Sequence, residues 1–397
     1  MEMITRLMEM ITRSRLAAAW LTMFLVGTEL FVFSPLLPLL AADYQISAGV
    51  AGLLVTIFSL TYMSCAPLLG HVSDRIGRRR MLSCALLVFA AANLLTALVP
   101  NLPSLLAVRI CAGASAAGIS PSIYALVGQS APPDRRGTWL AVAASGLLVS
   151  LALGASTGAI AAASFGWPTI FVALAGLSLA LAWLNRQVWP GEPTVMARSS
   201  ATTPDRRIAA ALACRLIPTA VWSTGLYGVY TYLGAGLIAV GFSTGDAAWA
   251  ILCYGGGAIA GVFIGGHVTD RLGVKFTARV SFGGLCACLL ILRMALDTGT
   301  LVEPVIGVSS AVAQLFFPAQ QVGLANDFPR QRGAALAWNN SALFFGISLG
   351  SAIGGQAVAL GSFDLNLTIS AGIALIGWCV TAIVVPDQAT DRNRPRQ

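Results

Sequence analysis

The stretch GHVSDRIGRR occupies residues 70–79, and GHVTDRLGVK, at residues 266–275, repeats it closely. The two copies lie 196 residues apart in a chain of 397 residues. Each copy is charged, and each follows a long apolar run. A charged segment placed at the same point of two similar apolar stretches indicates an internal duplication.

The composition indicates which solvent surrounds the two repeats. Hydrophobic residues make up 57% of the chain and charged residues only 10%, whereas soluble domains carry about 25% charged residues. A membrane-spanning helix needs about 20 mostly apolar residues, and lipid requires every backbone group to bond internally. We therefore expect an all-α polytopic membrane protein with twelve transmembrane helices, at about residues 17–40, 48–70, 81–99, 103–128, 137–162, 167–189, 212–239, 247–269, 277–296, 302–325, 333–360 and 365–385.

Basic residues predict the orientation of these spans. All but Arg109 and Arg293 of the 24 Lys and Arg fall at one predicted face, in tails, loops or the adjoining ends of spans. The opposite loops carry acidic residues and no Lys or Arg. By the positive-inside rule both termini face the cytoplasm, in a multi-pass protein of the bacterial cytoplasmic (inner) membrane. The net charge of +8 follows from this topology and gives no indication of a nucleic-acid partner.

The duplication divides the chain into two six-helix halves. Residues 190–211, PGEPTVMARSSATTPDRRIAAA, form a polar stretch typical of a linker. GASTG at 154–158 matches GSAIG at 350–354, so Gly154, Gly158, Gly350 and Gly354 are candidate helix-packing glycines. The predicted order is a cytoplasmic tail (1–16), a first half (17–189), a linker (190–211), a second half (212–385) and a second cytoplasmic tail (386–397).

The repeated decapeptide resembles a signature of the major facilitator superfamily, G-x-x-x-D-R-x-G-R-[RK]. The first copy supplies Gly70, Asp74, Arg75, Gly77, Arg78 and Arg79; the second keeps Gly266, Asp270, Arg271 and Gly273. Val274 stands where the first copy has Arg78. The resemblance implies that Asp74 braces the start of the span at 333–360 when the cytoplasmic side is closed. The alternative is that these charges only set topology at the lipid surface.

Arg109 lies inside the predicted span at 103–128. With Gly113 and Ala117 it resembles the R-x-x-x-G-x-x-x-[AG] pattern of the drug:proton antiporter branch of the same superfamily. A buried cation must face a partner or a wet cavity. The alternative is that Arg109, about six residues into the helix, reaches the membrane surface with its long side chain.

Glu29 is the most deeply placed acid of the sequence, in the stretch GTELFVFSPLLPLLAADYQIS at 27–47. This opening resembles the sugar-efflux and multidrug-efflux permeases of the bacterial arabinose-efflux type, which carry their membrane acid here. A carboxyl that is neutral when dry and charged when hydrated or paired with a cation can carry a proton. We therefore expect Glu29 and Arg109 to couple transport to protons. The alternative is a polar residue bonded to a neighbouring helix.

One departure from the antiporter pattern keeps other functions open. Ser156 stands where the antiporter signature of the span at 137–162 has proline. The sequence favours proton-coupled export, by alternating access, of small amphipathic drugs, metabolites or sugar-like compounds. A proton-coupled importer or facilitator of a small metabolite, and a lipid or lysolipid translocator, remain alternatives. No extramembrane segment is large enough for an enzyme site, and we expect no metal, no cofactor other than protons, and a monomer.

Polar and aromatic residues in the spans that line the centre of this fold are candidates for the substrate cavity, because small-ligand sites combine apolar walls with a few hydrogen-bonding groups. They are Phe33, Tyr124, Tyr227, Tyr230, Tyr232, Gln314, Gln320, Asn339, Asn340 and Phe345.

Overall fold

The computed structural model describes residues 2–132, 135–190, 206–299 and 301–385. Every regular element within these ranges is a helix. Eleven helices are long and apolar enough to cross a membrane, and one bent pair makes the twelfth span. The twelve-helix prediction is confirmed. The predicted linker at 190–211 and the predicted tail at 386–397 lie largely or wholly outside the described residues.

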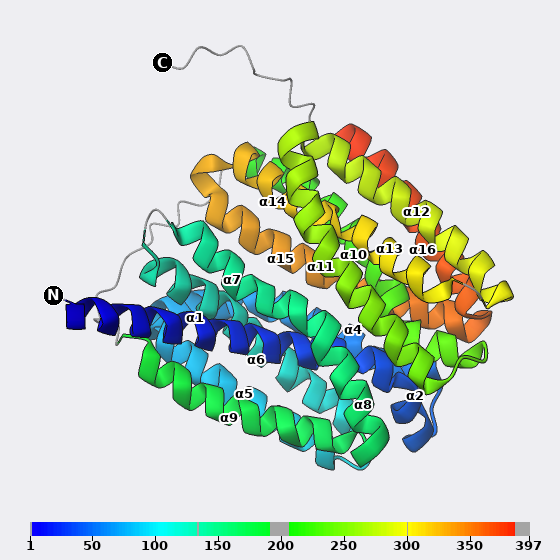
Figure 1. Ribbon diagram of the computed structural model, residues 1–397, viewed down its shortest axis with the longest axis horizontal. Coiled ribbons are helices and arrows are strands. Elements are labelled where there is room, and N and C mark those ends of the chain that lie inside the picture. The colour runs from blue at the N-terminus through cyan, green and yellow to red at the C-terminus, as the bar shows by residue number, and fades with distance from the viewer. Residues whose placement is uncertain (1, 133–134, 191–205, 300, 386–397) are drawn as a thin grey trace, which may run out of the picture.

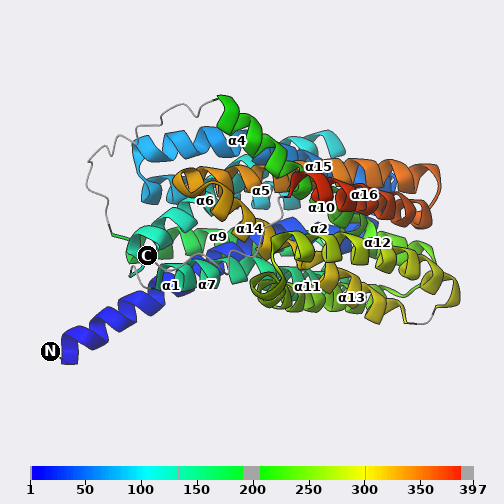
Figure 2. The ribbon, with the colours of Figure 1, turned by 90° about the horizontal axis from the view of Figure 1, so that it is seen from above.

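The spans run side by side along the length of the molecule (Figure 1), and the first turns of α1 project beyond the bundle (Figure 2). The first half comprises α1 (Glu2–Phe31) with α2 (Phe33–Asp43), α3 (Ala48–Ala51) with α4 (Leu53–Ile76), α5 (Arg78–Leu98), α6 (Leu102–Ser130), α7 (Arg136–Val149) with the π-helical turn η2 (Ser150–Gly154) and α8 (Ala155–Phe165), and α9 (Pro168–Val188). The second comprises α10 (Arg206–Ala239), α11 (Thr244–Leu272), α12 (Val274–Thr298), α13 (Val302–Gln314) with α14 (Phe316–Asp327), η3 (Pro329–Gln331) with α15 (Arg332–Leu360), and α16 (Phe363–Val384).

The second half repeats the first in a register of 196 residues. Ser47 and Ser243 each cap a helix, accepting hydrogen bonds from the backbone N–H groups of Val50 and Asp246. Gly77 and Gly273 separate the second and third spans of each half, with φ of 94° and 85°. Only glycine adopts such angles readily, so the glycines of the repeated decapeptide make the two turns.

The halves differ in where their spans are broken. The first span bends by 43° between α1 and α2, one turn before Pro35. The fifth span contains the π turn η2, whereas its counterpart α15 is a regular helix. In the second half the tenth span is broken instead, between α13 and α14 at Leu315. Such breaks are sites where a helix can change shape.

The two halves meet along α4 with α15, α2 with α10, and η2 with α11. Hydrogen bonds cross this seam from near the middle of α4, where Tyr62 lies, to α3, and at the bend between α1 and α2. Those that the structure shows are Asn340 to Tyr62 (3.0 Å), Ser348 to the Thr56 carbonyl (3.1 Å), Ser351 to the Gly52 carbonyl (2.9 Å), Tyr232 to the Gly49 carbonyl (3.5 Å), Ser34 to the Tyr230 carbonyl (2.5 Å) and Tyr230 to the Phe31 carbonyl (3.0 Å). These bonds hold the halves together at the end of the molecule away from the start of α1.

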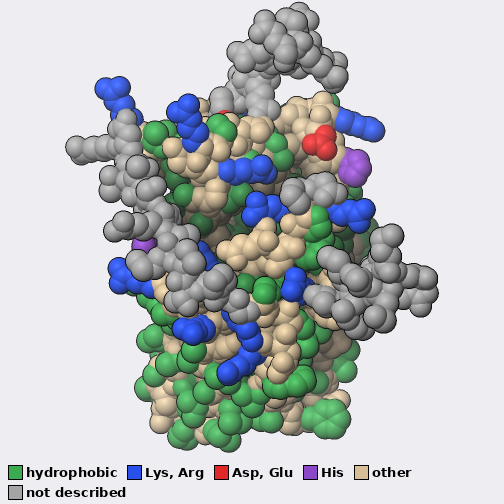
Figure 3. Space-filling model, turned by 90° about the vertical axis from the view of Figure 1, so that its left-hand side faces the viewer, with side chains coloured by type: hydrophobic (Ala, Val, Ile, Leu, Met, Phe, Trp, Pro, Cys, Tyr) green, Lys and Arg blue, Asp and Glu red, His purple; other side chains and the backbone are tan. Residues whose placement is uncertain are grey.

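Lys and Arg side chains gather on the end at which α1 begins (Figure 3). We call this the basic end. Arg75, Arg136, Arg186 and Arg271 lie at helix ends on this side. At the opposite end Asp43 is the last residue of α2, and Asp246 and Asp364 lie in the first turns of α11 and α16. The distribution matches the expected one, and the assignment of the basic end to the cytoplasm stays a prediction.

Candidate functional site

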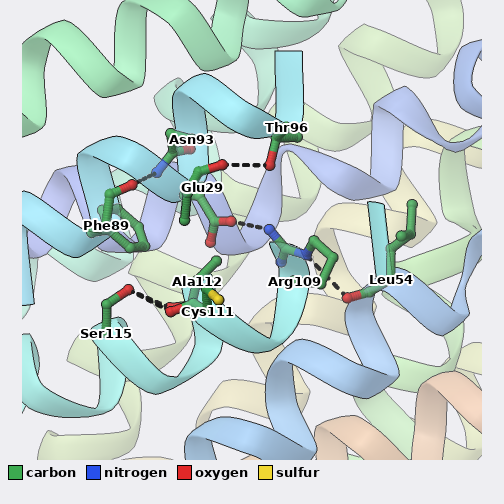
Figure 4. Close-up of polar contacts among 10 residues, drawn as sticks. Glu29, Leu54, Phe89, Asn93, Thr96, Arg109, Cys111, Ala112 and Ser115 are labelled. Carbon is green, nitrogen blue, oxygen red and sulfur yellow. Dashed lines mark hydrogen bonds and ion pairs between the residues drawn. The ribbon is translucent and has the colours of Figure 1, made fainter. Parts of the chain in front are cut away.

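Glu29 of α1 and Arg109 of α6 form an ion pair inside the first half (Figure 4). The Nη1 group of Arg109 donates to Oε1 of Glu29, and Nε donates to the Leu54 carbonyl of α4 at 3.2 Å. The two side chains are 1% and 0% exposed. Arg109 therefore faces an acidic partner and does not reach the surface.

Two aromatic rings enclose the Arg109 guanidinium. Its central carbon lies 4.0 Å from the ring centre of Phe33 and 4.5 Å from that of Phe58, a geometry that stabilises a cation over aromatic faces. Gly113, one turn after Arg109, lets α6 approach α4, because a Cβ there would lie 2.4 Å from the Phe58 carbonyl oxygen. The rings and helices thus exclude solvent from the pair.

The pair is incompletely bonded. Oε2 of Glu29 and Nη2 of Arg109 are buried without a hydrogen-bond partner among the described residues, as is Oγ1 of the adjacent Thr28. Each unsatisfied buried group costs about 1–3 kcal/mol. The free carboxylate oxygen is the atom of this pair at which a proton could be added.

The π turn η2 packs against the turn of α1 that carries Glu29. A Cβ at Gly154 would lie 2.2 Å from Thr28 Oγ1, and one at Gly27 would lie 2.0 Å from Ser150 Oγ. On its other side Ala152 of η2 touches the second half, where a Cβ at Gly255 would lie 2.1 Å from the Ala152 Cα. Glycine packing therefore fits η2 closely between α1 and α11.

The other predicted packing glycines also sit at close helix contacts. A Cβ at Gly158 would lie 2.4 Å from Val32 Cγ2, and one at Gly350 would lie 2.3 Å from the Thr224 carbonyl oxygen. At Gly354 the nearest atom would be the Gly228 carbonyl oxygen, at 2.8 Å. All four predicted glycines thus lie where a methyl group would collide with a neighbouring helix.

Aromatic residues next to the ion pair form a cluster across the two halves. Phe31 stacks on Tyr227 at 6.2 Å between ring centres and meets Tyr230 edge-on at 5.7 Å. A small pocket at this seam is lined by Phe31, Tyr227 and Tyr230 together with Ser34 and Thr231. Tyr232 lies apart from this pocket, at the inter-half seam, and its hydroxyl donates to the Ser351 carbonyl at 2.8 Å.

A second polar group lies near the middle of the seam between α4 and α15. The Asn340 amide donates to the Tyr62 hydroxyl at 3.0 Å, and Phe344 stacks on the Tyr62 ring at 3.6 Å. Asn339 accepts a hydrogen bond from Thr219 at 2.6 Å. Tyr124 of α6, another predicted cavity residue, is only partly exposed. These side chains offer hydrogen bonds without a net charge.

Not all predicted cavity residues meet at the centre. Gln320 donates to the Arg215 carbonyl at 2.7 Å within the second half. Gln314 of α13 is buried and hydrogen-bonds the side chain of Tyr227, which lines the pocket at the seam. Phe345 is 43% exposed, on the same face of α15 as Trp338 and Leu349. The structure therefore does not bring Phe345 together with the other cavity candidates.

The repeated decapeptide lies at the basic end. Asp74 pairs with Arg78, four residues later, and its side chain is 48% exposed. Gly70 and Gly266 have no neighbouring atom within 4 Å of a built Cβ, so close packing does not explain them. In the second copy Val274, the counterpart of Arg78, is buried at 3% exposure. The expected brace between Asp74 and the start of α15 remains a prediction, because here Asp74 bonds to its own segment.

Several residues of the site were not among the sequence candidates. Phe58 and Tyr62 face the site from α4, and Thr28 touches η2. Phe58 is apolar, Tyr62 and Thr28 each carry a single hydroxyl, and all three lie in apolar helices. A spacing of four places Phe58 and Tyr62 on one face of α4, but the same spacing occurs in any packed helix.

The family model of the Major Facilitator Superfamily matches residues 19–245 and 219–397. The chain belongs to this superfamily of transporters. The uncharacterized MFS-type transporter YceJ of Bacillus subtilis (strain 168) is 30% identical over 340 residues, which cover 84% of this chain and 86% of YceJ. A chloramphenicol resistance protein of Streptomyces lividans is 28% identical over 258 residues, covering 62% and 64% of the two chains.

Solved structures show the same fold. A D-xylose-proton symporter superposes with a TM-score of 0.79 at 19% identity, covering 94% of this chain and 98% of the symporter. A bacterial homolog of the human lysosomal transporter Spinster, in an inward-facing and occupied conformation, gives 0.77 at 16% identity, covering 96% and 98%. The protein is therefore a multi-pass membrane transporter and not an enzyme.

Proposed function

We propose that this transporter exports a small amphipathic molecule in exchange for protons, with Glu29 as the proton carrier. The observation that carries the proposal is the buried Glu29–Arg109 pair with its unpartnered carboxylate oxygen. An acid inside a membrane protein is costly and marks ion or proton pathways. The basic end would face the cytoplasm of a bacterial cell, with the protein working as a monomer in the inner membrane.

The ion pair gives the carboxyl two states. While Glu29 is charged it holds Arg109, and through Arg109 it ties α1 to α6 and to the Leu54 carbonyl. Protonation removes the charge that Arg109 faces, so α1 and α6 are held less tightly. Proton and substrate are coupled if each favours a different arrangement of the two halves. Export requires that proton entry from outside and substrate loading from inside occur in opposite conformations.

The charge of the site favours an uncharged substrate. Glu29 and Arg109 cancel each other, and the polar groups at the seam, Tyr62, Asn339 and Asn340, are neutral. A relative named for chloramphenicol resistance supports export of a drug-like compound. A relative from Escherichia coli (strain K12), 28% identical over 229 residues, is a 3-(3-hydroxy-phenyl)propionate transporter, so a metabolite importer is the second candidate.

Purified protein in liposomes with an imposed pH gradient tests the proposal. Lumenal pH is followed while uncharged drugs, aromatic acids and sugars are added one at a time, for the wild type and for Glu29→Gln. We expect substrate-triggered proton movement in the wild type only. Glu303→Gln, the same change at the first turn of α13, is the matched control and should leave proton movement unchanged.

Other results would replace the proposal. Substrate transport without proton movement in the wild type would make the protein a facilitator. Protons moving in the same direction as the substrate would make it an importer. Proton movement that survives in Glu29→Gln would place the carrier elsewhere.

A further inference from the structure

Pro35 leaves one backbone carbonyl of the first span without its normal partner. In an α-helix the carbonyl of residue 31 accepts from the N–H of residue 35, and proline has no N–H. The Phe31 carbonyl instead accepts from the Tyr230 hydroxyl at 3.0 Å. Tyr230 belongs to α10 in the other half of the molecule, and both residues are 3% exposed. A side chain from the second half thus completes a broken helix of the first.

The contact is reciprocal. Ser34 Oγ donates to the backbone carbonyl of Tyr230 at 2.5 Å. Phe31 and Ser34 lie on either side of the 43° bend between α1 and α2. The Tyr230 ring also packs against Tyr254 of α11, at 4.7 Å between ring centres. Tyr230 therefore fastens both sides of the bend to the second half.

The bend begins two residues after Glu29. Whenever the halves separate at the end away from the basic end, Tyr230 must leave Phe31. The Phe31 carbonyl is then unpaired, and a buried carbonyl in that state requires a new donor. Water can then serve as the donor, and its entry would hydrate α1 within one turn of Glu29.

We propose that Tyr230 is a positioning residue. Its hydroxyl closes the path to Glu29 from the end of the molecule opposite the basic end. This inference rests on the proposed proton coupling at Glu29. While the hydrogen bond between Tyr230 and Phe31 is made, the bend is fixed and no water reaches Glu29 from this end of the molecule. When the bond breaks, hydration of the Phe31 carbonyl opens the route by which a proton reaches the carboxyl. Tyr230 acts through the backbone of Phe31, and its ring also lines the small pocket at the seam.

Tyr230→Phe tests the hydroxyl alone, because the ring is kept. Proton flux into liposomes is measured under a pH gradient without substrate, and then with a transported substrate. We expect the substrate-free proton leak to rise about fivefold, the effect of losing one hydrogen bond, and the number of protons moved per substrate to rise with it. Tyr44→Phe is the matched control, since it also removes a tyrosine hydroxyl bonded to a backbone carbonyl, that of Val99 at 2.8 Å within the first half, and its leak should stay at the wild-type level.

Pro35→Ala provides a rescue that acts on the Phe31 carbonyl alone. Alanine restores the N–H that the Phe31 carbonyl lacks, so the hydroxyl of Tyr230 becomes redundant. The double variant Pro35→Ala, Tyr230→Phe should return to the wild-type leak, although each half of the molecule has been altered. Thermal stability in detergent, measured for all variants, identifies any that are misfolded.

Three results would overturn the inference. They are a Tyr230→Phe leak equal to that of the wild type, a Tyr44→Phe leak as large as that of Tyr230→Phe, and a double variant as leaky as Tyr230→Phe alone. If instead Glu29→Gln leaves substrate-triggered proton movement intact, the proposed function itself fails. The Glu29→Gln measurement therefore separates the two failures.

Discussion

The two halves share a framework and differ in what they hold inside it. The serine caps at 47 and 243 and the glycine turns at 77 and 273 repeat in a register of 196 residues. The first half encloses the ion pair of Glu29 and Arg109, whereas the same register places Gly225 and Val305 at the corresponding positions of the second half. The second half contributes an aromatic group instead, in which Trp222, Tyr227, Tyr230 and Tyr254 contact one another in sequence.

The difference separates the features that the fold requires from those that are candidates for a role in transport. Features present in both halves, such as the positive-φ glycines Gly77 and Gly273, are needed wherever this arrangement of six helices is built. Features present in one half only are free of that requirement. The helix breaks belong to the second kind, since α1–α2 and η2 adjoin Glu29 while α10 and α15 are continuous.

The prediction with the largest expected effect compares substitutions of the two buried arginines, Arg109 and Arg215. Arg109→Gln leaves the Glu29 carboxylate dry and without its cation, and breaking such a pair costs about 3–5 kcal/mol. We expect a large fall in melting temperature and loss of substrate-driven proton movement. Arg215 pairs with Asp327 at 2.6 Å near the basic end, where Asp327 is 24% exposed and can be hydrated.

Arg215→Gln should therefore lower the melting temperature less and keep substrate-driven proton movement within about twofold of the wild type, the loss of a partly hydrated pair being roughly 1 kcal/mol. Melting in detergent and proton flux in liposomes measure both effects. Equal loss of proton movement in the two variants would show that the charged pair of the first half has no special role.

A second test uses the corresponding glycines Gly154 and Gly350. An alanine methyl at 350 would meet the Thr224 backbone oxygen at 2.3 Å, whereas at 154 it would meet the Thr28 side chain at 2.2 Å. Backbone in a regular helix yields less than a side chain beside a π turn. We expect Gly350→Ala to destabilise by about 2–3 kcal/mol and Gly154→Ala by roughly 1 kcal/mol, measured as melting temperatures.

Transport should show the opposite order, because only Gly154 packs beside Glu29. Initial rates of substrate-driven proton movement, corrected for the amount of folded protein, would measure it. A greater loss of transport in Gly350→Ala than in Gly154→Ala would contradict the assignment of η2 to the coupling machinery.

The smallest expected effect concerns the repeated decapeptide. Asp74 and Arg78 form an exposed pair of the i,i+4 type, which contributes about 0.3–0.5 kcal/mol. Asp74→Asn should thus barely change the melting temperature. If Asp74 also braces α15 in the other conformation, the same change slows transport several-fold. Asp270→Asn, in the copy where Val274 replaces the second arginine, is the control and should slow transport less.

The fold could be predicted from the sequence because few kinds of structure can span a lipid bilayer. Long apolar runs must be helices, and the repeated decapeptide marks equivalent turns of the two halves. The bend of the first span lies one turn before Pro35, and a proline can be read from the sequence as a helix interruption because it lacks an N–H group. The π turn was not predicted, because Ser150–Gly154 contains no proline and a π turn has no residue signature of comparable strength.

The candidate site was predictable in its charges and not in its neutral parts. Glu29 and Arg109 stood out because a charge inside a membrane is costly. Tyr62 and Phe58 did not, since an aromatic residue in an apolar helix is ordinary. Phe345 was chosen as a central contact although it lies on the outer face of α15, because the helical phase of a nearly uniform apolar span cannot be read from its residues.

Glu29 is the only Asp or Glu among the described residues whose side chain is buried. This limits the substrate concentration ratio that the proposed exchange can maintain. One carboxyl carries one proton per cycle, so the proposed exchange of a proton for an uncharged substrate moves one positive charge. A membrane potential of 100 mV supplies about 2.3 kcal/mol to that charge, which corresponds to a roughly 50-fold concentration ratio. Each unit of pH difference adds about tenfold. A second carboxyl would square these ratios, so the single acid limits how completely the cell can be cleared of the substrate.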